Sequence, residues 1–191
     1  MKPFPDMLAT GRLILRPPTA ADADDVLAAV TASYPELHRW MEWARGPYGI
    51  DQARQFCADA RAAFDDGRDF NGLVTLADDD TVIGAVAILL KDEAVPSFEI
   101  GYWLHTGYTG RGYATEAAGA MTRLAFEEGG AKRVAARVDE RNSRSAAVAE
   151  RLGFELEGTL KSHRRDNEGR LSGTLIYAMT DLGSLAAPIH E

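Results

Sequence analysis

Hydrophobic and polar positions along the 191-residue chain recur with two periods, which predicts both strands and helices. The short apolar run at residues 13–15 predicts a strand, and Pro17 and Pro18 end it. Apolar residues at helical spacing then predict a helix over residues 20–31, capped by Thr19. The aromatic-rich stretch 34–48 is predicted to be helical in part and then looped.

The middle of the chain changes from a helical to a strand period. A helix is predicted to begin with Asp51 as its cap and to stop at Gly67. Strands are then predicted at residues 72–77 and 82–90, and the polar turn between them indicates an antiparallel hairpin. A further strand is predicted over residues 98–104.

The second half alternates helices and strands. Small residues at helical spacing predict a helix over residues 114–127, which Gly129 and Gly130 end. The remaining elements are a strand at 134–138, a helix at 143–152 and two closing strands at 154–161 and 173–179. This order predicts an α/β fold with layers of helices flanking a mixed sheet of about seven strands.

Length and composition indicate how many domains the chain forms and where it acts. A chain of this length with 46% hydrophobic residues predicts one domain over residues 1–185, followed by a loose tail at 186–191. Because Cys57 is the single cysteine and the first residues lack a secretory pattern, we expect a cytoplasmic protein. No apolar stretch approaches the roughly 18 residues that span a bilayer, so we expect no membrane insertion.

Charge argues against nucleic acid as a partner. The net charge of −8 opposes general binding to a polyanion. The stretch 132–151 nevertheless carries six cations and three anions, which favours a compact anionic ligand there. Solvated faces of a helix and a strand are the alternative explanation.

Gly110 and Gly112 lie between the strand at 98–104 and the helix at 114–127. Glycines at this place let backbone N–H groups approach a ligand, and a helix N-terminus adds partial positive charge, so the pattern indicates a phosphate site. A plain turn into a helix is the alternative. The dinucleotide pattern G-x-G-x-x-G is excluded because Thr115 stands where its third glycine would be, and the G-x-x-x-x-G-K-[ST] loop is absent.

Four blocks of the sequence are EIGYWL at 99–104, GRGYATEA at 110–117, NSRS at 142–145 and LGF at 152–154. In this order they resemble the GNAT superfamily of N-acetyltransferases. The blocks LILRP at 13–17 and LHRWMEW at 37–43 extend the resemblance, over most of the chain, to the RimJ/RimL type, which acetylates ribosomal-protein N-termini. The family pattern Q/R-x-x-G-x-G/A is met at Gly112 and Ala114, whereas its first position is Thr109.

The resemblance implies a mostly antiparallel sheet with a V-shaped splay between the strands at 98–104 and 134–138, where acetyl-CoA binds without a metal. Its pyrophosphate would lie on backbone donors, which do not depend on the side chain at position 109. Arg111, Arg141 and Arg144 are candidates for contacts with phosphate groups. The full set of cofactor candidates is Leu104, Thr109, Gly110, Arg111, Gly112, Tyr113, Ala114, Asn142 and Arg144.

Direct acetyl transfer needs an acid for the departing thiolate and a base for the amine. Ser145 is the polar member of an inward helix face, and the resemblance implies that it is the acid while Asn142 orients the cofactor; helix capping is the alternative. Glu99 faces away from its apolar strand neighbours and is the candidate base, or else a solvated residue or a salt-bridge partner. His38 and His163 are alternative bases.

The stretch 34–48, called here the acceptor wall, is expected to border the amine. Trp40, Trp43 and Tyr102 are candidate acceptor contacts, and Glu42 would attract a cation; core packing of the aromatic residues is the alternative. A lysine costs about 3 kcal/mol more to deprotonate than an α-amine, so a site without a strong base favours an α-amine.

The predicted function is therefore acetyl-CoA-dependent N-acetylation of a protein or peptide N-terminus by direct transfer. Acetylation of a small amine, such as an antibiotic, a polyamine or an amino-acid derivative, is the first alternative. A CoA-binding sensor without turnover is the second. We expect the protein to be a monomer or a homodimer.

Overall fold

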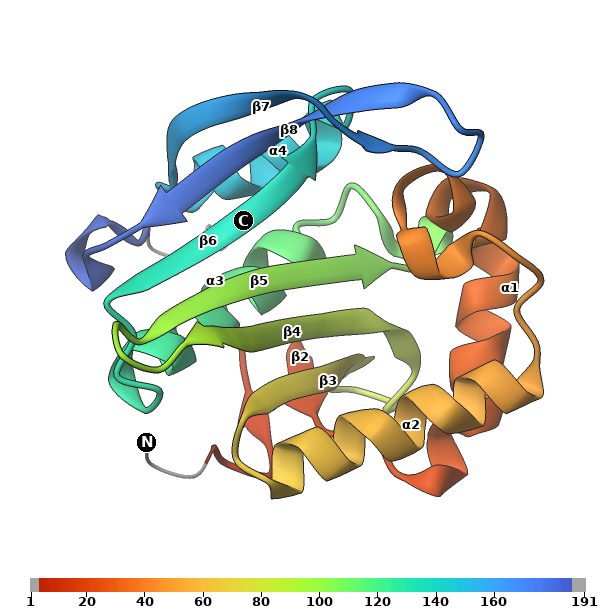
Figure 1. Cartoon of the computed structure of the whole chain (residues 1–191). Helices are drawn as coiled ribbons and strands as arrows, with labels where there is room; N and C mark the ends of the chain where they lie inside the picture. Colours follow the sequence, from red (N-terminus) through yellow and green to blue (C-terminus); the bar gives the residue numbers. More distant parts are fainter. Residues whose placement is uncertain (1–3, 187–191) are drawn as a thin grey trace.

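The strands pair into one eight-stranded sheet in the order β1-β2-β3-β4-β5-β6-β8-β7 (Figure 1). The structure is a computed structural model that describes residues 4–186. Its strands are β1 Leu8–Ala9, β2 Leu13–Arg16, β3 Asp69–Leu76, β4 Val82–Asp92, β5 Ser97–Leu104, β6 Arg133–Asp139, β7 Glu155–Arg165 and β8 Leu171–Met179. All neighbours are antiparallel except β5 and β6, which confirms the predicted mixed and mostly antiparallel sheet. The eighth strand is β1, whose two residues are too few to show alternation.

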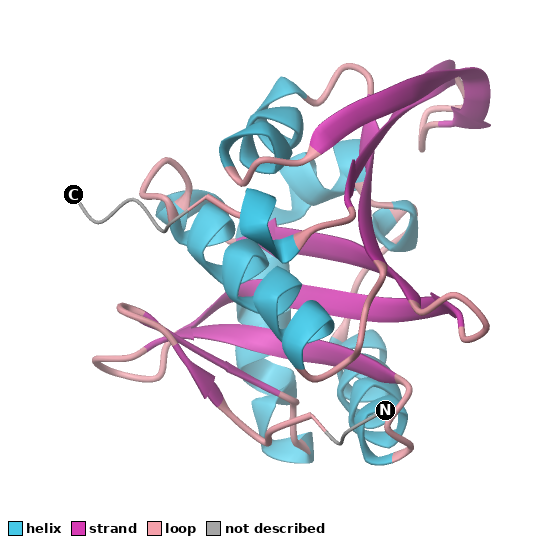
Figure 2. Cartoon of the chain, turned by 90° about the vertical axis from the view of Figure 1, so that its left-hand side faces the viewer, coloured by secondary structure: helices cyan, strands magenta, loops and turns pink. Residues whose placement is uncertain are grey.

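Helices lie on both sides of the sheet (Figure 2). The α-helices are α1 Ala23–Trp40, α2 Ile50–Asp65, α3 Tyr113–Glu127 and α4 Ser143–Arg151. Short 3-10 turns are η1 Ala20–Asp22, η2 Glu42–Ala44, η3 Thr106–Tyr108 and η4 Leu182–Ser184. One core cluster joins the sheet to α3 and α4, and a second joins it to α1 and α2.

Strand β5 shows how alternation divides its side chains between these two clusters. Phe98 and Ile100 are buried in the cluster under α3, and Tyr102 packs against the same cluster. Trp103 packs against the α1–α2 cluster on the opposite face. Glu99 shares this second face and is partly exposed, as the alternation predicts.

The sheet opens between β5 and β6. Their parallel pairing covers four residue pairs, from Ser97 with Arg133 to Ile100 with Ala136. Beyond that point β5 pairs only with β4, while β6 pairs only with β8, and the two strands diverge (Figure 1). This gap is the V-shaped splay expected between the central strands.

Helix α1 is longer than predicted. The sequence prediction ended it at residue 31, but it continues through Pro35 to Trp40. A proline removes the hydrogen bond to the carbonyl four residues earlier, here Thr31. Thr31 is exposed, so water can satisfy that carbonyl, and Thr106 Oγ1 lies 3.3 Å from the neighbouring Ala32 carbonyl.

The predicted cap of α2 was wrong by two residues. Gly49 is the N-cap, and its N–H donates to Gln52 Oε1 at 2.9 Å, so Asp51 lies within the first turn. Most of the expected C-terminal tail, residues 187–191, lies outside the described part of the chain. Ala186 is described, and its N–H donates to the Leu152 carbonyl at 3.1 Å. Between residues 4 and 186, no helix has the length and apolarity needed to cross a bilayer.

Candidate functional site

The loop between β5 and α3 presents backbone donors. Gly110 and Gly112 have φ angles of 78° and 80°, a left-handed conformation that favours glycine, and Gly112 is the N-cap of α3. The N–H groups from Gly110 to Ala114 have no hydrogen-bond acceptor among the described residues. Unpaired donors at a helix N-terminus, where the helix dipole is positive, form a site for a phosphate group.

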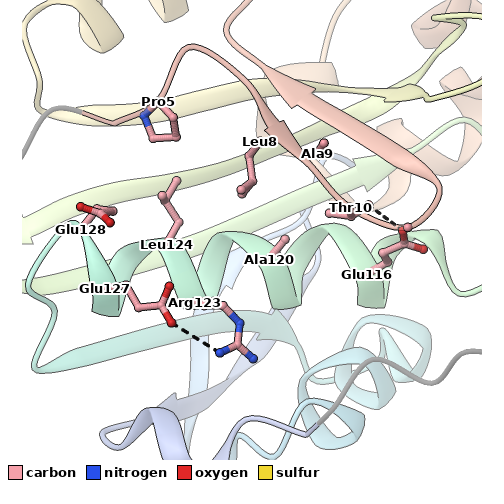
Figure 3. Close-up of a pocket in the computed structure, with 11 residues that line it drawn as sticks. Pro5, Leu8, Ala9, Thr10, Glu116, Ala120, Arg123, Leu124, Glu127 and Glu128 are labelled. Carbon is pink, nitrogen blue, oxygen red and sulfur yellow. Dashed lines mark hydrogen bonds and ion pairs between the residues drawn. The ribbon is translucent and has the colours of Figure 1, made fainter.

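The segment between β1 and β2 holds this loop in place. Glu116, in the first turn of α3, accepts a hydrogen bond from Thr10 Oγ1 at 2.6 Å (Figure 3). It also accepts one from Arg12 Nε at 2.7 Å. The Nη1 atom of the same guanidinium donates to the Arg111 carbonyl at 2.9 Å. Burial raises the pKa of Glu116, but the bonds from Thr10 and Arg12 hold it below its ordinary value. The loop conformation is thus tied to an ion pair.

The side chains of this loop contribute less than its backbone. Thr109 uses its hydroxyl internally, donating to the Thr106 carbonyl at 2.9 Å. The guanidinium of Arg111 lies over the Tyr108 ring at 5.5 Å and is exposed. The free backbone donors of the loop do not depend on the side chain at position 109, where the pattern that the sequence resembles has Gln or Arg.

The arginines of the basic stretch 132–151 have different partners. Arg144 is exposed in the first turn of α4 and bonds no other described residue, so its guanidinium is open to a ligand. Arg141 bonds Asp139 and Asp166 at 3.0 and 3.1 Å. Arg141 was a candidate for a phosphate contact at the loop, and the structure instead pairs it with these two carboxylates. Arg151 donates to Thr115 Oγ1 at 3.0 Å, beside the start of α3.

The open edge of β5 faces the splay. From Gly101 to Leu104, the strand has lost its partner on the β6 side, so backbone N–H and C=O groups there are unpaired by the sheet. Gly101 is exposed, and a Cβ at this position would meet nothing within 4 Å. An extended amide-containing ligand can add to this edge as a strand does.

Ser145 and Tyr102 meet across the splay. Their hydroxyl oxygens lie 3.1 Å apart, and the Tyr102 hydroxyl is also 3.1 Å from the Ser145 carbonyl oxygen. Burial raises the pKa of Tyr102 to about 12, so its hydroxyl stays protonated at neutral pH. Asn142 caps α4, accepting from the Ser145 N–H at 3.2 Å, which confirms the capping alternative for Asn142. Tyr102 thus contacts the predicted acid, away from the acceptor wall.

Glu99 lies on the face opposite to Ser145. Its side chain is 30% exposed, and Lys91 Nζ lies 3.9 Å from one carboxylate oxygen. The two histidines are occupied elsewhere: His38 Nδ1 is 2.8 Å from the Ala44 carbonyl, and His163 lies between Thr174 and Arg137 at 3.1 and 3.3 Å. Glu99 directly precedes Ile100, the last residue of β5 that pairs with β6.

The acceptor wall lies on the same face as Glu99. Trp43 is 46% exposed, and its ring centroid lies 6.1 Å from that of Trp103 on β5. Trp40 is partly exposed beneath the guanidinium of Arg39 at 4.5 Å. Glu42 is 66% exposed. Neither tryptophan belongs to a buried core cluster, but Trp43 lies against Tyr48 and Trp103, which pack on the α1–α2 cluster.

A groove of about 550 Å³ lies elsewhere, between the β1–β2 segment and the outer face of α3 (Figure 3). Leu8, Ala120 and Leu124 form its apolar floor, and Arg123 and Glu127 pair at its rim. It is separated from the splay by α3 itself, so we do not assign it to the chemistry.

Two features of the site were missed by the sequence analysis. The bonds from Arg12 to Glu116 join residues 104 positions apart. The buried carboxylate of Asp139 accepts hydrogen bonds from side chains in the turn after β6, in β7 and in β8. No local sequence pattern identifies both partners of either contact. A weak signal for the first is the glutamate in the first turn of a helix, a place that favours anions.

Comparison with known proteins adds the family. Residues 12–155 match the sequence profile of the acetyltransferase (GNAT) domain. The chain is 31% identical to the putative ribosomal N-acetyltransferase YdaF of Bacillus subtilis (strain 168), over 72% of this chain and 74% of that protein.

Solved structures share the fold. RimJ of Mycobacterium smegmatis, in complex with CoA-disulfide, is 28% identical with a TM-score of 0.78, covering 88% of this chain and 81% of that one. RimL, a ribosomal L7/L12 alpha-N-protein acetyltransferase in complex with coenzyme A, is 20% identical with a TM-score of 0.84, covering 92% and 98%.

Proposed function

The chain belongs to the GNAT family of acetyltransferases, and from this premise we propose that it transfers the acetyl group of acetyl-CoA to the α-amine of a protein or peptide N-terminus. The enzyme class and the use of acetyl-CoA follow from the family, whereas the acceptor is our proposal. The similarity to a putative ribosomal N-acetyltransferase supports this acceptor. The buried free thiol of Cys57 suits the reducing cytoplasm, where we propose that the enzyme acts.

The observation that carries the proposal is the arrangement of the two faces of the splay. Ser145 and Tyr102 lie on the α4 side of β5, and Glu99 lies on the other side with the acceptor wall. An acetyl thioester in the gap would then meet an amine from one face and lose its sulfur toward the other. This geometry suits direct transfer in a ternary complex.

We assign the roles as follows. Glu99 accepts a proton from the amine, directly or through water, and the amine nitrogen forms a bond to the acetyl carbon. The carbon–sulfur bond breaks, and the Ser145 hydroxyl gives a proton to the departing thiolate. Tyr102 orients that hydroxyl at 3.1 Å and stays protonated. Glu99 releases the amine proton to solvent, and solvent returns a proton to Ser145, so both residues regain their starting state. Unpaired N–H groups of β5 beyond Ile100 are available to the carbonyl oxygen.

The cofactor site is proposed over the adjacent loop. The free N–H groups from Gly110 to Ala114 would bind the pyrophosphate, and Arg144 and Arg111 offer exposed cations to the phosphate groups. The edge of β5 up to Leu104 would pair with the pantetheine amides. Asn142 acts here by fixing the start of α4 and thereby Ser145.

An acceptor screen tests the proposed function. Thiol release from acetyl-CoA is measured with peptides that begin with Ser or Ala, with the same peptides blocked at the N-terminus but carrying a lysine, and with aminoglycosides and polyamines. We expect turnover on the free N-termini and little on the blocked peptides. A preference for the small amines would replace the proposed acceptor, and turnover on the blocked peptides would indicate a lysine acetyltransferase.

A further inference from the structure

Asp139, the last residue of β6, is a buried anion at the open end of the splay. Its side chain is 2% exposed and accepts hydrogen bonds from three other side chains. These are Arg141 Nε at 3.0 Å, Arg164 Nη2 at 3.2 Å and Ser172 Oγ at 2.8 Å. Burial raises the pKa of Asp139, but the bonds from Arg141 and Ser172 bring it well below its ordinary value. A charge so enclosed fixes the positions of its partners.

One of these partners leads to the proposed acid. Arg141 lies in the turn between β6 and α4, and its backbone N–H also donates to the Asp139 carboxylate at 3.0 Å. The next residue, Asn142, caps α4 through the Ser145 N–H. Asp139 therefore fixes the turn that precedes α4, the helix that carries Ser145.

A second partner leads to the acceptor wall. Arg164 lies on β7, and its Nη1 is 3.7 Å from Glu42 Oε1. Its Nη2 is 3.5 Å from the Trp40 carbonyl oxygen, at the outer limit of a hydrogen bond. One guanidinium thus spans the distance between β6 and the wall, which a lysine ammonium cannot do because it is a single point of charge.

The hairpin that carries Arg164 is anchored to the wall independently. Asn167, at the tip of the β7–β8 hairpin, donates through Nδ2 to the carbonyls of His38 at 2.7 Å and Met41 at 2.9 Å. The tip lies beside the end of α1 (Figure 1). Loss of the Arg164 side chain would therefore leave the hairpin in place and remove the contacts that join Asp139 to Glu42 and Trp40.

The orientation of Arg164 leaves one donor unused. Its Nε atom is buried and has no hydrogen-bond partner among the described residues. Buried polar groups are nearly always paired, so an unpaired one calls for an explanation. The contacts of the two Nη atoms with Asp139 and with the acceptor wall account for it, because they fix the plane of the guanidinium.

We infer that Arg164 is a positioning residue for the acceptor, because it holds the acceptor wall at a fixed distance from Asp139 and hence from the turn that begins α4. This inference rests on the proposed function, which places the amine between the wall and Glu99. It assigns to Arg164 an effect on acceptor binding and none on acetyl-CoA, whose proposed contacts are the edge of β5 and the loop from Gly110 to Ala114.

The test compares Arg164→Met with Arg170→Met. Arg170 lies on the same hairpin, is 61% exposed and bonds Asp166 and Glu168, but makes no contact with the wall. We expect Arg164→Met to raise the acceptor KM about tenfold, to leave kcat within about twofold and to leave the Kd of acetyl-CoA unchanged. Arg170→Met should change none of these values.

A second variant separates positioning from folding. Arg164→Lys keeps a cation beside Asp139 but cannot reach the wall as well, so it should fold like the wild type and still raise the acceptor KM. An unchanged acceptor KM in both Arg164 variants would overturn the inference, as would a parallel loss of acetyl-CoA affinity. Failure of the wild-type enzyme to acetylate any N-terminus would instead count against the proposed function, before any variant is compared.

Discussion

The hydroxyl groups of Tyr102 and Ser145 lie 3.1 Å apart, joining β5 to the first turn of α4 across the splay. The Tyr102 hydroxyl has no hydrogen-bond partner outside Ser145 among the described residues, and it also donates to the Ser145 carbonyl at 3.1 Å. The tyrosine is therefore placed to orient the serine hydroxyl and has little direct access to the acceptor wall. This relationship determines how the two residues should respond to substitution.

We predict that Ser145→Ala lowers kcat about tenfold or more and leaves the Kd of acetyl-CoA nearly unchanged. Tyr102→Phe should lower kcat less, because it removes only the orienting hydroxyl. If Tyr102 acts through Ser145, the double variant should be no slower than Ser145→Ala alone. Steady-state kinetics on the four proteins measure this. Multiplied effects in the double variant would show that the two hydroxyls act independently.

Substitution of Gly110 tests whether the free N–H groups from Gly110 to Ala114 bind the cofactor. A Cβ at Gly110 meets nothing within 4 Å, and the same holds for Gly130, which also has a left-handed φ. Alanine costs roughly 1–2 kcal/mol in that conformation at either position. We therefore expect Gly110→Ala and Gly130→Ala to lose similar stability, but only Gly110→Ala to weaken acetyl-CoA binding. Thermal denaturation and calorimetric titration provide the two measurements; equal affinities would remove the loop from the cofactor site.

Glu99→Gln should lower kcat/KM for the acceptor about tenfold at pH 7, because the amine loses its proposed base. The deficit should shrink as the pH rises above about 8, where an α-amine loses its proton to solvent. The control is Lys91→Ala, which removes the cation 3.9 Å from Glu99 and keeps the carboxylate. A deficit that is constant from pH 7 to 9.5 would speak against Glu99 as the base.

The hairpin should be sensitive to acid through Asp166. Burial raises the pKa of this carboxyl, but the bonds from Arg170 and Arg141 bring it to about 2. Since the folded-state pKa is below that of the unfolded chain, near 3.8, Asp166 stabilises the fold above pH 3.8 and loses that contribution as the pH falls toward 2. The stability difference between the wild type and Asp166→Asn should therefore shrink between pH 5 and 2.5 in urea titrations. A difference that stays constant would contradict the pairing.

Local patterns were enough to predict most of the fold. Alternation along 98–104 placed Glu99 and Trp103 on one face of β5, and the glycines at 110 and 112 marked the turn into α3, because both signals depend on neighbours in the sequence. The end of α1 was missed since a proline usually stops a helix, whereas Pro35 is tolerated beside an exposed Thr31.

The parts of the site that could not be predicted depend on distant contacts. Arg12 and Glu116 are 104 positions apart, and Arg164 and Trp40 are 124 apart. Each of these arginines is compatible with a solvated surface when only its neighbours are considered. Likewise Arg141 was a reasonable candidate for a phosphate contact until the fold placed Asp139 and Asp166 beside it.

The short pairing of β5 with β6 also affects how the molecule holds together. Within residues 4–186, these four residue pairs are the only strand pairing that joins the β1–β5 half of the sheet to the β6–β8 half. A donor molecule whose amides pair along the open edge would continue the interrupted ladder as an additional strand. The substrate would then bridge the two halves of the sheet beyond Ile100, where β5 and β6 no longer pair.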